Sequence, residues 1–181
     1  SIARFMLERE GLEYGLDDFF ITAGASPQIY TIYRAIADKG EKIIYSVPSW
    51  NNNHYVHFVE GEHCALETSA ENNFMPTAED IRPHLDGAVL LALCSPLNPT
   101  GTTFSSEQLE DICDMVIEEN NRRPADAKKL FILYDQIYWQ LTFGQTEHYN
   151  PVSLRPELKP YTIFVDGISK CFAATGVRVG W

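Results

Sequence analysis

Lys170 and Arg178 lie close together in the stretch DGISKCFAATGVRVGW, which spans residues 166–181. Small neighbours such as Gly167 and Ala173 leave room around the lysine. The pKa of a lysine shifts readily when its amine is buried. A neutral amine can form a Schiff base, and a planar guanidinium suits a phosphate. Taken alone, Lys170 could equally be a solvated surface lysine. The stretch therefore predicts an imine-forming site only in combination with other residues.

Asp135 is the second candidate, because it ends the apolar run LFILY of residues 130–134. An unpaired carboxylate in such surroundings is unfavourable, so Asp135 needs a cation or hydrogen-bond donors. A protonated ring nitrogen would serve, and Tyr138, three residues later, could place its hydroxyl near the same ring. The alternative is that Asp135 caps the start of a helix.

Three further loops carry residues suited to a flat anionic ligand. The backbone N–H groups of Ala25 and Ser26 begin a helix with Pro27 in its first turn, where an anion is stabilised; Ser26 could also be a plain N-cap. Trp50 could stack on a ring or pack in a core. The amide of Asn98, in the turn NPTG, could face a ligand or only cap the turn.

Strand-like and helix-like segments alternate along the chain, and they must position these side chains. The apolar run 87–94, GAVLLALC, is typical of a strand covered on both faces. The alternation predicts one domain over residues 1–181, with a three-layer α/β/α fold around a mostly parallel sheet. We expect seven strands, at 18–22, 41–47, 63–68, 87–94, 129–135, 161–166 and 177–181. We expect helices at 2–10, 26–38, 51–60, 77–85, where Thr77 and Asp80 form a capping box, and 106–121.

Ligands of open parallel sheets bind outside the carboxyl ends of the strands. Five expected strand exits carry candidate residues: Ala25 with Ser26, Trp50, Asn98, Asp135 with Tyr138, and Ser169 with Lys170. A phosphate cradle, a stacking ring, a partner for a pyridinium, a partner for a phenolate and an imine-forming lysine together match pyridoxal phosphate. Asp135 would keep the ring nitrogen protonated, so that the ring takes up electrons. Lys170 would hold the cofactor and then move a proton between the substrate Cα and the imine carbon.

Composition excludes other classes of function. The chain has 181 residues, 45% of them hydrophobic, with 14 basic and 25 acidic residues and a formal charge of −11. This charge disfavours binding to nucleic acid or an anionic membrane. The four cysteines form no CxxC pair and no histidine cluster, which predicts no metal site and free thiols in a reducing compartment. With no long apolar run and no signal-peptide pattern, we expect a cytoplasmic protein.

Five motifs in order, AGAS, VPSWNNN, SPLNPTG, YDQIY and SKCFAATGVRVGW, resemble the fold-type I class I/II aminotransferases related to aspartate aminotransferase. The resemblance implies pyridoxal phosphate as cofactor. It gives Lys170 the Schiff base, Asp135 the pyridine nitrogen, Tyr138 and Asn98 the 3-oxygen, Trp50 the ring face, and Ala25, Ser26 and Arg178 the phosphate. The family often has a phosphate-binding serine three residues before the lysine, where this chain has Gly167; Ser169 is a second candidate for that contact.

The resemblance also implies amino acid and 2-oxo acid substrates and a homodimeric parent protein. Family members are about twice as long, with an N-terminal arm and a C-terminal small domain that supplies the arginine for the substrate carboxylate. We therefore expect residues 1–181 to be a truncated large domain with little activity alone. A C–S β-lyase, another lyase of this fold, and a non-catalytic regulatory module remain alternatives. A nicotinamide-binding fold is disfavoured because no GxGxxG follows a strand.

Overall fold

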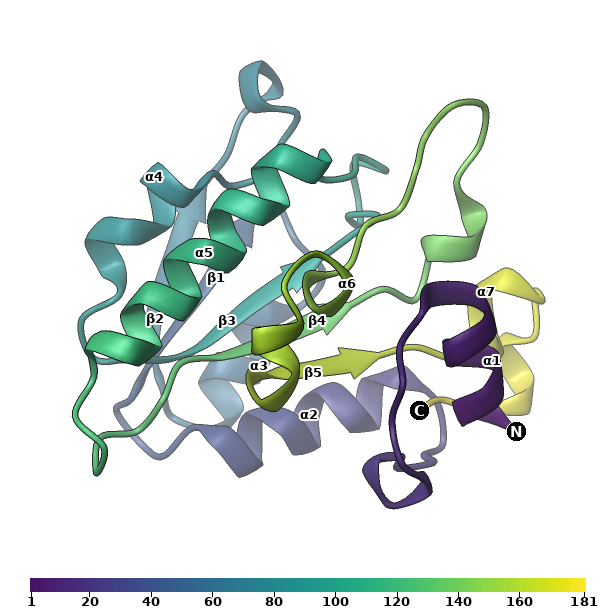
Figure 1. Ribbon diagram of the computed structural model, residues 1–181, viewed down its shortest axis with the longest axis horizontal. Helices are drawn as coiled ribbons and strands as arrows, with labels where there is room; N and C mark the ends of the chain where they lie inside the picture. Colours follow the sequence, from purple (N-terminus) through teal and green to yellow (C-terminus); the bar gives the residue numbers. More distant parts are fainter.

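A five-stranded parallel sheet lies at the centre of the computed structural model, which describes all residues from Ser1 to Trp181 (Figure 1). The strand order is β2-β1-β3-β4-β5, and every neighbouring pair is parallel. All five carboxyl ends therefore lie at one edge of the sheet. The strands are β1 (Lys42–Val47), β2 (Glu62–Glu67), β3 (Ala88–Cys94), β4 (Phe131–Asp135) and β5 (Thr162–Val165).

Helices connect the strands, and their starts follow ordinary capping rules. Ser105 caps the longest one by accepting the Gln108 N–H at 3.1 Å. The predicted capping box is confirmed, because Thr77 and Asp80 accept each other's backbone N–H groups. The helices are α1 (Ile2–Glu10), α2 (Ala25–Ile36), α3 (Asn52–Phe58), α4 (Ala78–Ile81), α5 (Ser106–Arg122), α6 (Pro151–Leu154) and α7 (Ile168–Cys171).

The sheet is covered on both faces, as the apolar strands predict. Along β3, Leu90 and Ala92 pack in a core with α2 and α3, whereas Leu91 and Leu93 pack in a second core with α4 and α5. This split follows from the two-residue repeat of a strand, which points successive side chains to opposite faces. Figure 1 shows α5 lying across the strands on the side of the viewer. The three-layer α/β/α prediction is confirmed.

The expected count of seven strands is wrong, because the two edge segments pair only through isolated bridges of Gly180 with Thr22 and Gly167. Residues 16–18 form a 3-10 turn, so extended backbone begins only at Phe19 in the first segment. In the second segment the left-handed Arg178, with φ of 60°, bends the chain before residue 179. Both bridges are antiparallel, but neither segment builds a ladder.

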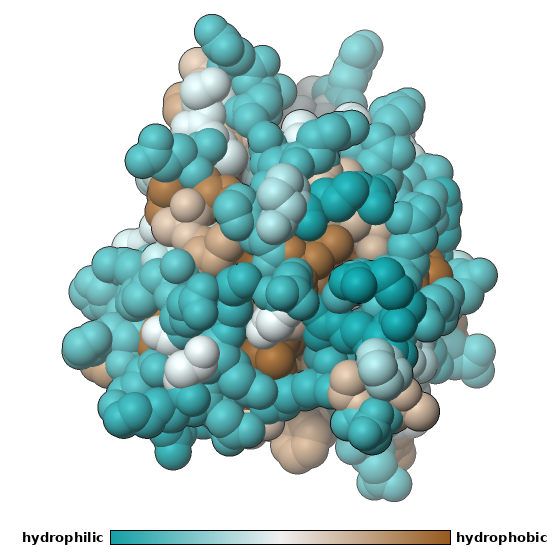
Figure 2. All heavy atoms as spheres, turned by 90° about the vertical axis from the view of Figure 1, so that its left-hand side faces the viewer, coloured by the Kyte–Doolittle hydropathy of each residue, from teal (hydrophilic) through white to brown (hydrophobic).

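The edge of the sheet at the amino ends of the strands carries charged side chains and none of the candidate site residues. Lys128, just before β4, forms ion pairs with Asp38 at 3.1 Å and Glu41 at 2.6 Å. The turn that contains Lys128 lies at the lower left of Figure 1, and Figure 2, which views that side, shows a mostly hydrophilic surface with small separate apolar areas. None of the helices combines the length and the apolar character needed to cross a membrane.

Asn120 is expected to be a critical polar residue of the core. It is buried, and its side chain donates to the Leu130 carbonyl at 2.9 Å and accepts the Leu130 N–H at 2.7 Å. Asn120→Ala leaves both backbone groups unsatisfied and should lower the free energy of unfolding by about 2–4 kcal/mol. Urea unfolding measures this loss. Asn120→Asp keeps the acceptor and, when its carboxyl is protonated at low pH, can also donate to the Leu130 carbonyl, so it should lose less stability at low pH than at high pH; equal stability of all three proteins would contradict the account.

Candidate active site

One pocket at the carboxyl edge of the sheet brings together all nine side chains that the sequence singles out. It has a volume of about 260 Å³. The carboxyl ends of parallel strands converge at this edge, which explains why residues 150 positions apart meet there. Its predicted lining residues are Ala25, Ser26, Trp50, Asn98, Asp135, Tyr138, Ser169, Lys170 and Arg178, and it also includes Ile29, Ile137 and Thr175.

The first side of the pocket is a positively charged cradle at the start of α2. The Arg178 guanidinium donates through Nη2 to the Ala23 carbonyl at 3.0 Å and through Nη1 to the Thr175 carbonyl at 2.9 Å. It lies directly against Gly24, where an added Cβ would be 2.4 Å from Nη2. Sequence reasoning missed Gly24 and Thr175, since only the folded chain shows this close approach.

Ser26 is not the N-cap of α2, contrary to that reading of the sequence. The helix begins at Ala25 with Gly24 as its cap, and no side chain bonds the first turn. The N–H groups of Ala25 and Ser26 are therefore among the unpaired donors of a helix start. Together with the guanidinium of Arg178, they make a site whose chemistry suits a phosphate.

Asp135 forms the floor of the pocket at the end of β4. Its Oδ1 accepts the Ile137 N–H at 3.1 Å, which argues against the helix-cap alternative, because no helix begins there. Burial raises the pKa of Asp135 to about 6, opposed by the Ile137 N–H and by the charge of Lys170. A carboxylate in this position is stabilised by a cationic N–H donor above it, which is what a pyridinium provides.

A further side of the pocket is formed by Lys170, Tyr138 and Asn98. The Asn98 Nδ2 donates to the Tyr138 hydroxyl at 3.2 Å, which leaves the hydroxyl hydrogen free to donate elsewhere. The Lys170 Nζ lies 5.5 Å from the centroid of the Tyr138 ring. Lys170 is exposed on α7, so its amine is accessible from the pocket. These three side chains thus line the same pocket as Asp135.

Trp50 and Ser169 complete the predicted set. Trp50 follows β1, is 52% exposed and lines the pocket, so the core-packing alternative does not hold for it. Ser169 is buried, and its carbonyl accepts the Thr175 hydroxyl at 3.2 Å. Ser169 therefore lies at the same side of the pocket as the α2 cradle, where Thr175 also bonds Arg178.

Close packing explains why position 167 is a glycine and not the serine that the family often has. A Cβ at this position would lie 2.7 Å from the Val179 carbonyl oxygen and 3.0 Å from the Cα of Gly180. The neighbouring C-terminal segment thus packs too closely for a serine. The departure noted in the sequence is therefore a packing requirement of this chain.

Residues 1–181 match the family described as aminotransferase class I and II over their whole length. The chain belongs to this family. An aspartate aminotransferase of Bacillus sp. (strain YM-2) is 30% identical to it over 172 residues, which cover 94% of this chain and 42% of the relative. An aspartate aminotransferase of Geobacillus stearothermophilus is 28% identical over 174 residues, which cover 95% of this chain and 42% of the relative.

Solved aminotransferase structures share the fold. Aspartate aminotransferase from Thermus thermophilus with maleate superposes with a TM-score of 0.87 at 29% identity, covering 99% of this chain and 44% of that one. The aromatic aminotransferase from Pyrococcus horikoshii gives a TM-score of 0.89 at 26% identity, covering 99% and 46%. The chain thus spans less than half the length of these relatives. The resemblance to class I/II aminotransferases drawn from the five motifs is confirmed.

The cradle of this aminotransferase chain gives a testable prediction. Gly24→Ala places a methyl group against Arg178 and should weaken the binding of pyridoxal phosphate by about tenfold or more, from loss of one charged hydrogen-bond pair. Binding of pyridoxal without phosphate should change far less. Gly40→Ala is the matched control, since Gly40 also has positive φ but open space around it. Equal losses for both variants would show that backbone strain, not the cradle, is responsible.

Proposed function

We propose that this chain is the cofactor-binding part of a pyridoxal-phosphate-dependent aminotransferase, which moves an amino group between an amino acid and a 2-oxo acid. The proposal is carried by the pocket that unites Lys170, Asp135 and the Arg178 cradle. Membership of the class I and II aminotransferases supports the same reaction, as do the names of the relatives.

Each side of the pocket suits one part of the cofactor. Arg178 and the N–H groups of Ala25 and Ser26 bind the phosphate, and the buried Ser169 hydroxyl is a further candidate. Trp50 covers the ring face. The chain therefore holds pyridoxal phosphate at its phosphate, at its ring face and, through Asp135, at its ring nitrogen. These three contacts fix both the position and the tilt of the ring.

The chemistry depends on two titratable groups. Pyridoxal phosphate, when bound, supplies an electron sink for the bond that breaks at the substrate Cα. Asp135 as a carboxylate holds a proton on the ring nitrogen, while Asn98 and Tyr138 donate to the ring oxygen. The Lys170 amine anchors the cofactor and, when the substrate amine replaces it, moves a proton at the substrate Cα.

The substrate class follows from the relatives, two of which are named as aspartate aminotransferases. We propose a dicarboxylic amino acid as the amino donor and a 2-oxo acid as the acceptor. The chain spans less than half the length of these relatives, so we expect full activity from the full-length protein and little from this part alone. Within the same proposal, the full-length protein is a cytoplasmic homodimer.

The test is an assay of the full-length protein with aspartate, phenylalanine or cystathionine, each with 2-oxoglutarate. We expect formation of the matching 2-oxo acid and glutamate, fastest with aspartate. Release of ammonia and pyruvate from cystathionine without glutamate would instead establish the lyase alternative. Tight cofactor binding with no turnover of any amino acid would favour the non-catalytic module.

A further inference from the structure

The carboxylate of Asp166 is buried directly behind the pocket, and the proposed chemistry does not use it. The residue is 1% exposed. Its Oδ1 accepts the Gly167 N–H at 2.7 Å, and its Oδ2 accepts the Trp139 Nε1–H at 2.8 Å. Its backbone N–H and carbonyl pair with Trp181 at 2.9 and 3.0 Å. Asp166 thus links its own segment, which continues through Gly167 into α7, to the segments of the distant residues Trp139 and Trp181.

Each of these segments carries a residue of the pocket. Trp139 directly follows Tyr138, Gly167 caps the short helix α7 that holds Lys170, and Trp181 lies three residues after Arg178. Tyr138 itself belongs to no helix or strand, because it only caps the 3-10 turn that starts at Trp139. Tyr138 accepts from the Asn98 amide at its hydroxyl and from the Leu141 N–H at its carbonyl, so its position depends on these bonds and on what holds the next residue.

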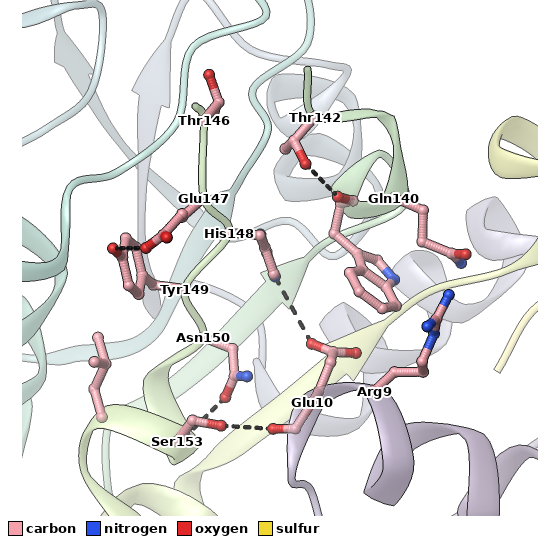
Figure 3. Close-up of a pocket in the computed structure, with 12 residues that line it drawn as sticks. Arg9, Glu10, Gln140, Thr142, Thr146, Glu147, His148, Tyr149, Asn150 and Ser153 are labelled. Carbon is pink, nitrogen blue, oxygen red and sulfur yellow. Dashed lines mark hydrogen bonds and ion pairs between the residues drawn. The ribbon is translucent and has the colours of Figure 1, made fainter. Parts of the chain in front are cut away.

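The backbone of Trp139 bonds Gln136 and Thr142, but its indole side chain has few other anchors. On its far side it lines a second hollow of about 570 Å³, which also contains Glu10 and His148 (Figure 3). Burial raises the pKa of Glu10 to about 8 and lowers that of His148 to about 4, so neither group carries a firm charge near pH 7. The indole ring otherwise has only packing contacts, at 6.0 Å from Phe5 and 5.8 Å from His148, measured between ring centroids. Its one polar bond is the bond to Asp166.

We propose that Asp166 is a positioning residue that holds Tyr138 and Lys170 at a fixed separation, through its hydrogen bonds to Trp139 and Gly167. The inference rests on the proposed function, since it concerns the same cofactor pocket. A preorganised pocket needs less ordering when the cofactor binds, so the tether raises affinity without touching the cofactor. It also keeps the Tyr138 hydroxyl within reach of the ring oxygen.

The test removes the tether from either end in the full-length protein. Trp139→Phe removes the indole N–H together with part of the ring and leaves the Asp166 carboxyl in place, whereas Asp166→Asn replaces one of the two accepting oxygens by an amide nitrogen. Phe5→Leu is the matched control, because it loosens the packing around Trp139 with the hydrogen bond intact. Three quantities are measured: the dissociation constant of pyridoxal phosphate, the pH midpoint of its bound absorbance, and urea unfolding of the cofactor-free protein.

We expect Trp139→Phe and Asp166→Asn each to weaken cofactor binding by about tenfold, with no further loss in the double variant. The pH midpoint should move upward, as in Tyr138→Phe, because a donor to an anionic oxygen favours the deprotonated form. Phe5→Leu should lower the free energy of unfolding but leave the dissociation constant and the pH midpoint unchanged. Wild-type affinity and midpoint in Trp139→Phe would overturn the inference, even if Asp166→Asn has an effect. Failure of the wild-type protein to bind pyridoxal phosphate would instead overturn the proposed function.

Discussion

Replacing Lys170 by alanine is expected to abolish covalent retention of pyridoxal phosphate and to lower the transamination rate by at least ~10²-fold, since both anchor and proton carrier are lost. The effect is measured by dialysing cofactor-loaded full-length protein and recording the remaining cofactor absorbance. Lys170 is exposed and forms no hydrogen bond with another side chain, so the fold should be retained.

A second lysine provides the control for this experiment. Lys39 is equally accessible but lies far from the pocket, where it pairs with Glu60 at 2.6 Å. Lys39→Ala should retain cofactor and rate, because a surface ion pair contributes little. If Lys170→Ala retained the cofactor after dialysis as well as Lys39→Ala does, Lys170 would not be the anchor.

Asp135→Asn should give the second large effect, a loss of about 10²–10³ in rate with the overall fold intact. The reason is electrostatic: the amide cannot hold a proton on the ring nitrogen by charge, although its oxygen can still accept the Ile137 N–H. Steady-state kinetics of the full-length variant measure the loss. A variant with the rate of the wild-type protein would contradict the assignment of Asp135 to the ring nitrogen.

The same substitution should stabilise the cofactor-free protein. Burial raises the pKa of Asp135 to about 6 from its usual value of 3.8, so ionisation of this group is less favourable in the folded state than in the unfolded state. The stability that the protonated group contributes is present below pH 4 and is lost as the pH rises through about 6. At pH 8, Asp135→Asn should therefore unfold with a free energy up to about 2 kcal/mol higher than wild type. Urea unfolding of both proteins at pH 4 and pH 8 tests this; an Asp135→Asn protein less stable than wild type at pH 8 would contradict it.

Most of the pocket residues were predictable because they combine a distinctive chemical type with a position after a strand; Ala25, Ser26 and Arg178 are the exceptions, since the segments at 18–22 and 177–181 form only isolated bridges. Asp135 follows an apolar strand, and Lys170 lies among small residues just after another. Parallel pairing then brings such exits to one edge, whatever the details of packing. All nine predicted residues line one pocket. Their individual roles toward the cofactor stay predictions.

What the sequence could not predict depends on close approach between distant segments. The contact of Gly24 with Arg178 and that of Gly167 with Val179 arise only when the C-terminal segment folds back. The same holds for Asp166, whose partner Trp139 lies 27 residues away. The prediction of two edge strands was wrong because the apolar residues at 18–22 and 177–181 indicate extended backbone but do not supply a pairing partner. The turn at 16–18 and the left-handed Arg178 shorten both segments.

The central claim is that Lys170 forms the covalent bond to pyridoxal phosphate. Reduction of the cofactor-loaded protein with borohydride, followed by proteolysis and mass spectrometry, locates that bond directly. We predict one modified peptide, which contains Lys170 and carries the added mass of the reduced cofactor, and no such peptide from Lys170→Ala. Modification at a different lysine, or an unmodified Lys170 peptide under saturating cofactor, would contradict the account.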